Sequence, residues 1–291
     1  MKLGNILVGN KAREGALEMT MSGPFLKLPA GLVFALTGAD LGAKLGGRPV
    51  PLNRAVYVKE DSTLSFGFAA QGARGYLTVA GGFAVPAVMN SKSTYLRAKI
   101  GGVGGAPLAD GTELETGELT AEQEGLKAVL AKTGGKPFST LGWSVETTGL
   151  FTGEPIRVTQ GLQADWFDNA TLQEFFHSGY TITAQSDRMG YRLSGAPLHY
   201  RDSSLEMISE PVTFGSIQVP ADGNPIILMA DRQTTGGYAK IGQVIQADLP
   251  RLAQMKPGQT IYFRPVTLTQ AEKALARQED FLTDVKMMVQ R

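Results

Sequence analysis

Glycine and proline interrupt the chain so often that they limit which folds it can adopt. The 291 residues include 36 glycines and 15 prolines. Proline removes a backbone donor and glycine favours turns, so neither suits the interior of long helices. Short apolar runs separated by such residues are typical of strands joined by tight turns. The sequence therefore predicts a mainly β protein with a few helices (α+β), and not a helical bundle.

The charge balance and the missing cysteines exclude several classes of protein. With 28 basic and 27 acidic side chains the net charge is +1, and no concentrated basic face is present to bind nucleic acid or an anionic membrane. The absence of cysteine excludes disulfides and thiolate nucleophiles. The apolar patch at residues 6–8 is too short for a signal peptide, and no run approaches the ~18 apolar residues of a membrane span. We expect a soluble, cytoplasmic protein.

Changes in pattern along the chain predict its division into parts. Residues 1–118 consist of short strand patterns, which predict an N-terminal β-rich lobe. Thr120, with Gln123 three residues later, forms a capping-box signal for a helix, and we interpret residues 119–149 as a helical connector. Residues 150–291 then form a C-terminal lobe.

The clearest candidate site follows the apolar run at residues 226–230. That run predicts a buried strand, and the next seven residues, DRQTTGG, contain no large apolar side chain. Charge, amide and hydroxyl groups with paired glycines are typical of a site loop that a rigid strand holds out. The alternative is an ordinary polar turn in which Asp231 and Arg232 pair with neighbours.

An Asp–Arg pair also follows the predicted strand at residues 180–184. Asp187 and Arg188 repeat the arrangement of Asp231 and Arg232. A structural salt bridge is one explanation for each pair. In the other, both pairs lie at one rim of a barrel, where the two arginines present planar guanidinium groups to a carboxylate or phosphate and the aspartates hold them in position.

The other motifs in the sequence provide less evidence about function than the two Asp–Arg pairs. The loop at residues 90–94 is rich in hydroxyls and carries one lysine. The glycine run at residues 101–105 lacks the Gly-Lys-Ser/Thr ending of a phosphate loop, so we interpret it as a flexible turn. His177 and His199 are too far apart for a zinc motif, and no Gly-x-Ser-x-Gly elbow is present. We predict no metal site on this chain.

Three segments of the chain resemble the biotin-dependent carboxyltransferase family. They read GYLTVAGGFAVPAVMNSKSTYLRAKIGG, SDRMGYRL and SEPVTFGSIQVPADGNPIILMADRQTTGGYAKIGQVIQADLPRL, and they follow the family's order over roughly residues 3–265. The family includes the C subunit of prokaryotic 5-oxoprolinase, the second subunit of proteins labelled allophanate hydrolase, part of the urea carboxylase carboxyltransferase domain, and the antagonist of a sporulation-kinase inhibitor.

The resemblance implies a cyclophilin-like β-barrel with a second β-rich lobe, and a hetero-oligomer with a B subunit that is related to that kinase inhibitor. Together with an A subunit, such proteins use ATP, with magnesium, to open the lactam of 5-oxoproline to glutamate. The implied function is that of the C subunit of this hydrolase, active only with its partners and without biotin on this chain. The alternatives are a biotin-dependent carboxyltransferase acting on urea-like amides and a regulatory antagonist of a histidine-kinase inhibitor.

The resemblance also suggests roles for residues. A lactam is resonance-stabilised, so opening it near neutral pH requires activation of the amide oxygen, for which phosphorylation is suited. A guanidinium group of Arg188 or Arg232 would bind the substrate carboxylate. We expect catalytic roles for Asp187, Arg188, Arg232 and Gln233, and substrate binding by Gln218, Tyr191, Thr234, Thr235, Ser93 and Thr94.

One departure from the family concerns the start of the chain. Members usually begin some tens of residues earlier, with a Gln-Asp-x-Gly-Arg segment and a Pro-x-Ser-Gly-Ala-Met-Asp-like segment. This chain starts after both, so we expect either a misassigned start codon or a truncated member. Its activity as written depends on whether those segments line the site.

Overall fold

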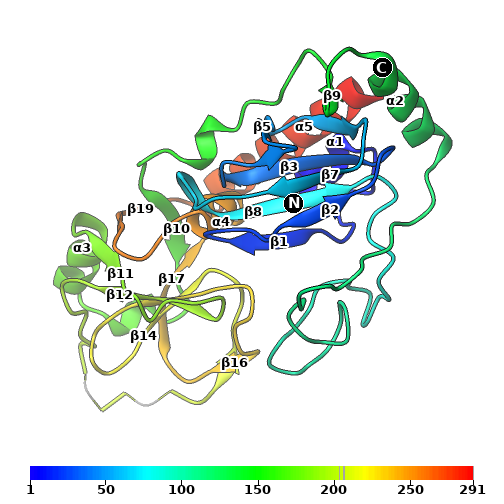
Figure 1. Ribbon diagram of the computed structural model, residues 1–291. Helices are drawn as coiled ribbons and strands as arrows, with labels where there is room; N and C mark the ends of the chain where they lie inside the picture. Colours follow the sequence, from blue (N-terminus) through cyan, green and yellow to red (C-terminus); the bar gives the residue numbers. More distant parts are fainter. Residues whose placement is uncertain (203, 206, 291) are drawn as a thin grey trace. The chain divides into compact units, whose positions relative to one another are not determined.

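The chain folds into two compact units, each with its own core (Figure 1). The computed structural model describes residues 1–202, 204–205 and 207–290, and the side chain of Thr148 lies outside that description. The first unit comprises Met1–Phe151 and Asp280–Arg291, and the second comprises Thr152–Glu279. The division differs from the predicted one, because residues 119–149 belong to the first unit and the end of the chain rejoins that unit.

The first unit contains two antiparallel sheets. The larger has the strand order β1-β8-β3-β6-β9 and the smaller has β2-β7-β4-β5. Apolar residues of both sheets, such as Phe34, Leu64 and Leu77, share one buried cluster. The bounds are β1 Leu17–Thr20, β2 Leu26–Leu28, β3 Val33–Asp40, β4 Lys44–Leu45, β5 Arg48–Pro49, β6 Ala55–Val58, β7 Ser62–Ser65, β8 Gln71–Val79 and β9 Phe138–Thr140.

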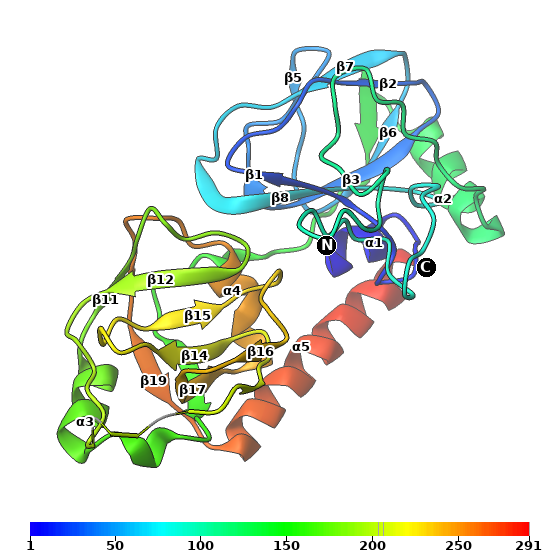
Figure 2. The ribbon, with the colours of Figure 1, turned by 90° about the horizontal axis from the view of Figure 1, so that it is seen from below.

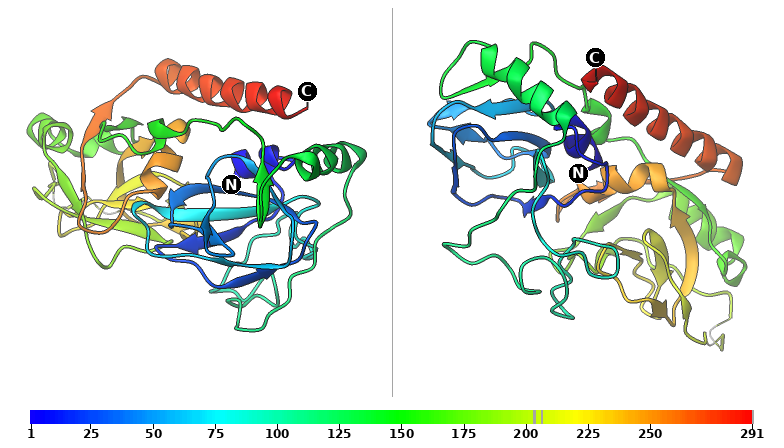
Figure 3. Two further views of the ribbon diagram at one scale, coloured as in Figure 1. Left: turned by 45° about the horizontal axis from the view of Figure 1, so that its top comes forward. Right: turned by 90° about the vertical axis from the view of Figure 1, so that its right-hand side faces the viewer.

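Helices cover part of the first unit (Figure 3). Helix α1 contacts β3 and β8, and helix α2 contacts β6 and β9. Leu7, Leu130 and Val285, from three different helices, share a second buried cluster. The bounds are α1 Lys2–Leu7, α2 Ala121–Lys132, η1 Thr148–Leu150 and α5 Leu268–Val289, and α5 belongs to this unit from Asp280 onward. No helix among the residues with described placement is long and apolar enough to cross a membrane.

The second unit is a nearly closed barrel (Figure 2). Its eight strands follow the order β18-β11-β12-β15-β14-β17-β10-β19, and only Tyr262 separates the two strands at the ends of this order. The pair β10 and β19 is parallel, and the other pairs are antiparallel. The expected mainly β fold with a barrel is therefore confirmed. Inward residues such as Val158, Ile217 and Ile227 form the core.

The barrel strands have the bounds β10 Ile156–Gln160, β11 Tyr180–Ile182, β12 Gly190–Ser194, β14 Ser216–Val219, β15 Ile226–Leu228, β17 Ala239–Val244, β18 Thr260–Ile261 and β19 Phe263–Pro265. Two very short strands, β13 Glu210–Pro211 and β16 Thr235–Gly236, pair outside this sheet. The helices of the unit are η2 Ala164–Trp166, α3 Asn169–His177, η3 Gln246–Asp248 and α4 Leu249–Ala253.

The predicted capping box at the start of α2 is confirmed and gives a stability test. The Thr120 hydroxyl accepts from the Gln123 backbone N–H at 3.3 Å, and the Gln123 side chain accepts from the Thr120 N–H at 2.9 Å. Replacing Thr120 by Ala should lower the free energy of unfolding by about 1 kcal/mol, because a helix N–H loses its partner. Thr120→Ser, which keeps the hydroxyl, should lose much less. Urea unfolding measures both, and equal losses in the two variants would contradict the prediction.

Candidate functional site

The two Asp–Arg pairs lie beside one another at one end of β12 and β15. These strands are antiparallel, and Gly190 at the start of β12 pairs with Leu228 at the end of β15. The segments next to these residues continue the pairing, since the Asp231 N–H donates to the Arg188 carbonyl at 2.7 Å. The barrel thus brings together two polar segments that are more than forty residues apart in the sequence.

A two-pronged ion pair joins the two segments. Arg188 donates from Nε to Oδ2 of Asp231 at 2.9 Å and from Nη2 to Oδ1 at 3.1 Å. Such paired, charge-assisted hydrogen bonds fix both planar groups in one orientation. The Asp231 side chain is 19% exposed and that of Arg188 is 38% exposed, so the pair sits partly out of solvent. The salt bridge runs between the two segments and not between sequence neighbours, and it occupies the planar group of Arg188.

The other two charged residues of the rim have different surroundings. Oδ1 of Asp187 accepts from the backbone N–H groups of Met189 at 2.8 Å and Gly190 at 3.2 Å, which ties it into the turn before β12. Half-buried Arg232 donates from Nε to the Val212 carbonyl at a long 3.4 Å. Among the described residues its terminal nitrogens have no partner, so Arg232 is the arginine of this rim that can receive an oxyanion.

The polar residues after Arg232 are exposed. Gln233, Thr234 and Thr235 all present their side chains to solvent. Their backbone is fixed, because the Val212 N–H donates to the Thr234 carbonyl at 3.0 Å and Thr235 pairs with Pro211 in the β13–β16 sheet. The segment therefore combines an ordered backbone with free amide and hydroxyl groups.

Two predicted substrate contacts lie elsewhere. Gln218 is 1% exposed, and its Nε2 donates to the Tyr238 carbonyl at 3.3 Å. A Cβ built on Gly236 would lie 2.5 Å from that nitrogen, so the loop packs directly on Gln218. Tyr191 is 3% exposed, and its hydroxyl donates to the Met255 carbonyl at 3.1 Å. Gln218 therefore supports the loop, and Tyr191 fills the barrel core. Neither side chain presents a polar group at the rim.

A cluster of charged and polar side chains that the sequence did not reveal supports the loop at residues 232–236. Nζ of Lys240 lies 2.6 Å from Oε2 of Glu210, and the lysine side chain is only 7% exposed. Gln163 donates from Nε2 to the same oxygen at 3.2 Å. The hydrogen bond from Lys240 holds the pKa of Glu210 below its usual value. The sequence signal was a lysine between the apolar residues Ala239 and Ile241 of the strand AKIGQV.

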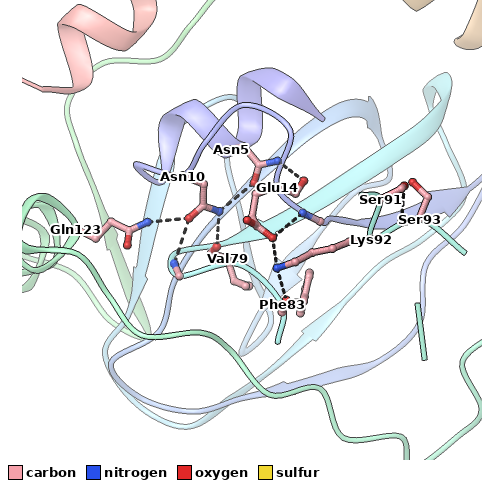
Figure 4. A network of polar contacts seen from close by, with 11 residues as sticks. Asn5, Asn10, Glu14, Val79, Phe83, Ser91, Lys92, Ser93 and Gln123 are labelled. Carbon is pink, nitrogen blue, oxygen red and sulfur yellow. Dashed lines mark hydrogen bonds and ion pairs between the residues drawn. The ribbon is translucent and has the colours of Figure 1, made fainter. Parts of the chain in front are cut away.

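Ser93 and Thr94 belong to the first unit, in the long connection between β8 and α2, and Figure 4 shows Ser93 beside Ser91 and Lys92. The Ser93 side chain is exposed. Thr94 contacts the glycine run, since a Cβ on Gly102 would lie 1.9 Å from its Oγ1. Gly102 also has φ +54°, a conformation that favours glycine. The run that we interpreted as a flexible turn is therefore a site of close backbone packing against the hydroxyl loop.

The neighbouring Lys92 anchors this loop through Glu14 (Figure 4). Its Nζ donates to the Glu14 carboxylate and, at 3.0 Å, to the Phe83 carbonyl. Burial favours a raised pKa for Glu14, but the hydrogen bonds from Lys92 and from the Gly15 N–H outweigh it, and the pKa lies below the usual 4.5. The charged form of Glu14 is thus part of the fold.

A chain of side-chain amides continues the network in Figure 4. Asn5, which is fully buried, donates to the Glu14 carbonyl at 2.7 Å. Asn10 donates to Oδ1 of Asn5 at 2.9 Å and receives from Gln123 of α2 at 2.7 Å. Asn10 also donates to the Val79 carbonyl at the end of β8. Amides therefore join α1, α2 and the start of the connection that carries Ser93 and Thr94.

Comparison with known proteins places the chain in a family. The family model described as "Carboxyltransferase domain, subdomain A and B" matches residues 1–265. The chain belongs to this carboxyltransferase domain family, which confirms the resemblance noted in the sequence.

Two curated relatives match almost the whole chain. The 5-oxoprolinase C subunit of Haemophilus influenzae is 35% identical over 99% of this chain and 87% of its own length. The 5-oxoprolinase C subunit of Escherichia coli is 37% identical over 97% of this chain and 84% of its own length. Among solved structures, the urea carboxylase of Kluyveromyces lactis superposes with a TM-score of 0.83 at 26% identity. That match covers 98% of this chain but 26% of the urea carboxylase chain.

The ion pair of Glu14 predicts a pH effect on stability. Because folding lowers the pKa of Glu14, the pair stabilises the protein above the unfolded value of about 4.5, and this contribution is lost as the pH falls through the folded value. Glu14→Gln should therefore lower the free energy of unfolding at pH 7 by up to about 1 kcal/mol, which lowers the melting temperature. At pH 3 the loss should be much smaller.

The matched control for that measurement is Glu124→Gln, since Glu124 is exposed and 4.0 Å from its lysine partner. Thermal unfolding of the three proteins across this pH range is the measurement. A constant difference between wild type and Glu14→Gln at all pH values would show that the carboxylate charge has no role.

Proposed function

We propose that this chain acts as the C subunit of a 5-oxoprolinase, in a complex with the A and B subunits. The observation that supports the proposal most is the similarity to two proteins of that name at 35% and 37% identity, over nearly the whole of each chain. The rim of the barrel adds a chemical argument, because it presents a cation beside amide and hydroxyl groups to a substrate that carries a carboxylate and a lactam.

In this proposal Arg232 binds the substrate carboxylate. The ion pair between Arg188 and Asp231 fixes the position of Asp231, the residue directly before Arg232. Among the described residues of the rim, Arg232 is then the arginine whose terminal nitrogens are free. Two parallel N–H···O contacts would fix the orientation of the ring. Arg188 and Asp187 then act by holding the rim in shape, and not by touching substrate.

The exposed side chains next to Arg232 would hold the lactam group. Gln233, Thr234 and Thr235 can each donate and accept hydrogen bonds, so they suit the N–H and the oxygen of an amide. Donors placed at the amide oxygen stabilise the negative charge that develops there during ring opening. Ser93 and Thr94 stay predicted substrate ligands of the first unit.

The nucleotide fits the partner subunits better than this chain. When bound, ATP with magnesium would supply a phosphoryl group for activating the amide oxygen, and magnesium in such sites is usually held by one or two carboxylates besides the phosphates. At the barrel rim, Asp187 is bonded to backbone N–H groups and Asp231 to Arg188. No three His, Asp or Glu side chains gather as a metal site in the part of the chain that the structure describes. We therefore assign ATP, with magnesium, to the complex as a whole.

A second function is favoured by the likeness to urea carboxylase. The fold and most of the chain match that protein with a TM-score of 0.83, and both reactions act on an amide. In this alternative the chain would transfer a carboxyl group from carboxybiotin to a urea-like amide, with the biotin carrier and the carboxylase supplied by other domains or chains.

Reconstitution tests the proposal. The chain is mixed with the A and B subunits of the proposed complex, and 5-oxoproline-dependent ATP hydrolysis and glutamate formation are measured with each component omitted in turn. The proposal expects turnover only when this chain is present. Turnover without it, or none in the full mixture while urea is carboxylated with a biotin carrier and a carboxylase, would reject the proposal. Tight binding to the B subunit with no turnover would instead fit a regulatory role.

The assigned role of Arg232 predicts a binding defect. Arg232→Ala should raise KM for 5-oxoproline about 10- to 100-fold, since a hydrogen bond to a charged group contributes about 1.5–3 kcal/mol. Arg232→Lys should recover only part of this, because an ammonium lacks the planar pair of donors. Arg192→Ala is the control, as Arg192 is exposed on β12 of the same barrel. Equal kinetics for Arg232→Ala and the control would remove Arg232 from the site.

A further inference from the structure

We infer that Lys240 is a positioning residue, which holds the Arg232–Thr235 segment in its working shape by clamping Glu210 to the barrel. This role is distinct from that of the rim ion pair, because it acts on the middle of the segment and not on its start. For catalysis the inference rests on the proposed function, whereas the clamp itself can be tested on the chain alone.

The barrel side of the clamp is a rigid frame. Ala239 and Ile241, the neighbours of Lys240 on β17, point into the barrel core, so Lys240 lies on the opposite face of the strand. Gln163 is bonded to the backbone of Lys240 in both directions, with its N–H donating to the Lys240 carbonyl and its Oε1 accepting from the Lys240 N–H, each at 3.2 Å. The ammonium and the amide therefore converge on Oε2 of Glu210 from fixed positions.

From Glu210 the connection to the segment runs through the backbone. Glu210 pairs with Gly236 and Pro211 pairs with Thr235 in the β13–β16 sheet. One residue further, Val212 donates its N–H to the Thr234 carbonyl and accepts at its own carbonyl from Nε of Arg232. The backbone hydrogen bonds that shape the middle of the segment therefore depend on where residues 210–212 lie.

Charge provides the force that docks this region. A buried ammonium needs a paired anion, because desolvation without a partner is costly, and Glu210 supplies that anion to Lys240. Apolar packing contributes at Val212, which is 5% exposed, and at Met207, which packs against the barrel core, but the clamp also has exposed neighbours in Ile208 at 88% and Tyr238 at 46%. Neutralising Lys240 should consequently free the middle of the segment, while the barrel core keeps its packing.

The test compares Lys240→Met and Glu210→Gln with the control Lys273→Met, which removes a charge from an exposed lysine of α5. Amide hydrogen exchange is measured on the free chain. Both clamp variants should exchange about tenfold faster at the Val212 amide, whose partner is Thr234, with unchanged exchange at Ile217 and Ile227 of the barrel. Unchanged exchange at Val212 in Glu210→Gln, or equally raised exchange throughout the barrel in both variants, would overturn the inference.

Kinetics in the reconstituted complex separate positioning from general damage. The clamp variants should raise KM for 5-oxoproline about tenfold, with kcat within about twofold of wild type, because the segment must be ordered before substrate binds. A fall in kcat at unchanged KM would contradict the positioning role. Failure of the wild-type complex to act on 5-oxoproline would reject the proposed function, while the exchange result would still decide the clamp.

Discussion

The double hydrogen bond between Arg188 and Asp231 is the interaction on which the candidate site depends. The antiparallel register already places the two strand ends side by side. The two hydrogen bonds from Arg188 to Asp231, of 2.9 and 3.1 Å, then hold these ends together at one rim of the barrel. The pair occupies one guanidinium group of the rim, whereas the terminal nitrogens of Arg232 bond to none of the residues that the structure describes. Without it, two like-charged arginines would stand at the same rim with no fixed orientation, and neither would present a defined site to a carboxylate.

The same principle recurs at two other loops of this fold. The barrel and the paired sheets supply a rigid apolar scaffold, but the long connection between β8 and α2 is rich in glycine and leaves large apolar side chains such as Met89 and Leu96 exposed and not packed. Charge pairs fix the two loops instead. Lys92 binds Glu14 beneath the hydroxyl loop, and Lys240 binds Glu210 beneath the segment after Arg232. In both pairs the lysine is more than two-thirds buried, which strengthens the attraction relative to a surface pair.

Local patterns in the sequence predicted local structure well. The strands predicted at residues 180–184 and 226–230 form as β11 and β15, each ending two residues earlier than predicted, and the capping box at Thr120 is formed as expected. The pairing of Arg188 with Asp231 was not predictable in the same way, because it depends on the register of two strands that are distant in sequence. A single sequence also does not show which face of β14 the segment after Arg232 covers. For that reason Gln218 was assigned to substrate and not to the support of Gly236.

The central claim is that the terminal nitrogens of Arg232 receive the substrate carboxylate while Arg188 stays bound to Asp231. Nuclear magnetic resonance of 15N-labelled arginine side chains tests it directly in the complex with the partner subunits, with signals assigned through Arg232→Lys. The account predicts that 5-oxoproline shifts the guanidinium signals of Arg232 and leaves those of Arg188 in place, and that 2-pyrrolidinone, the lactam without a carboxylate, shifts neither. A shift at Arg188 with none at Arg232 in an active complex would contradict it.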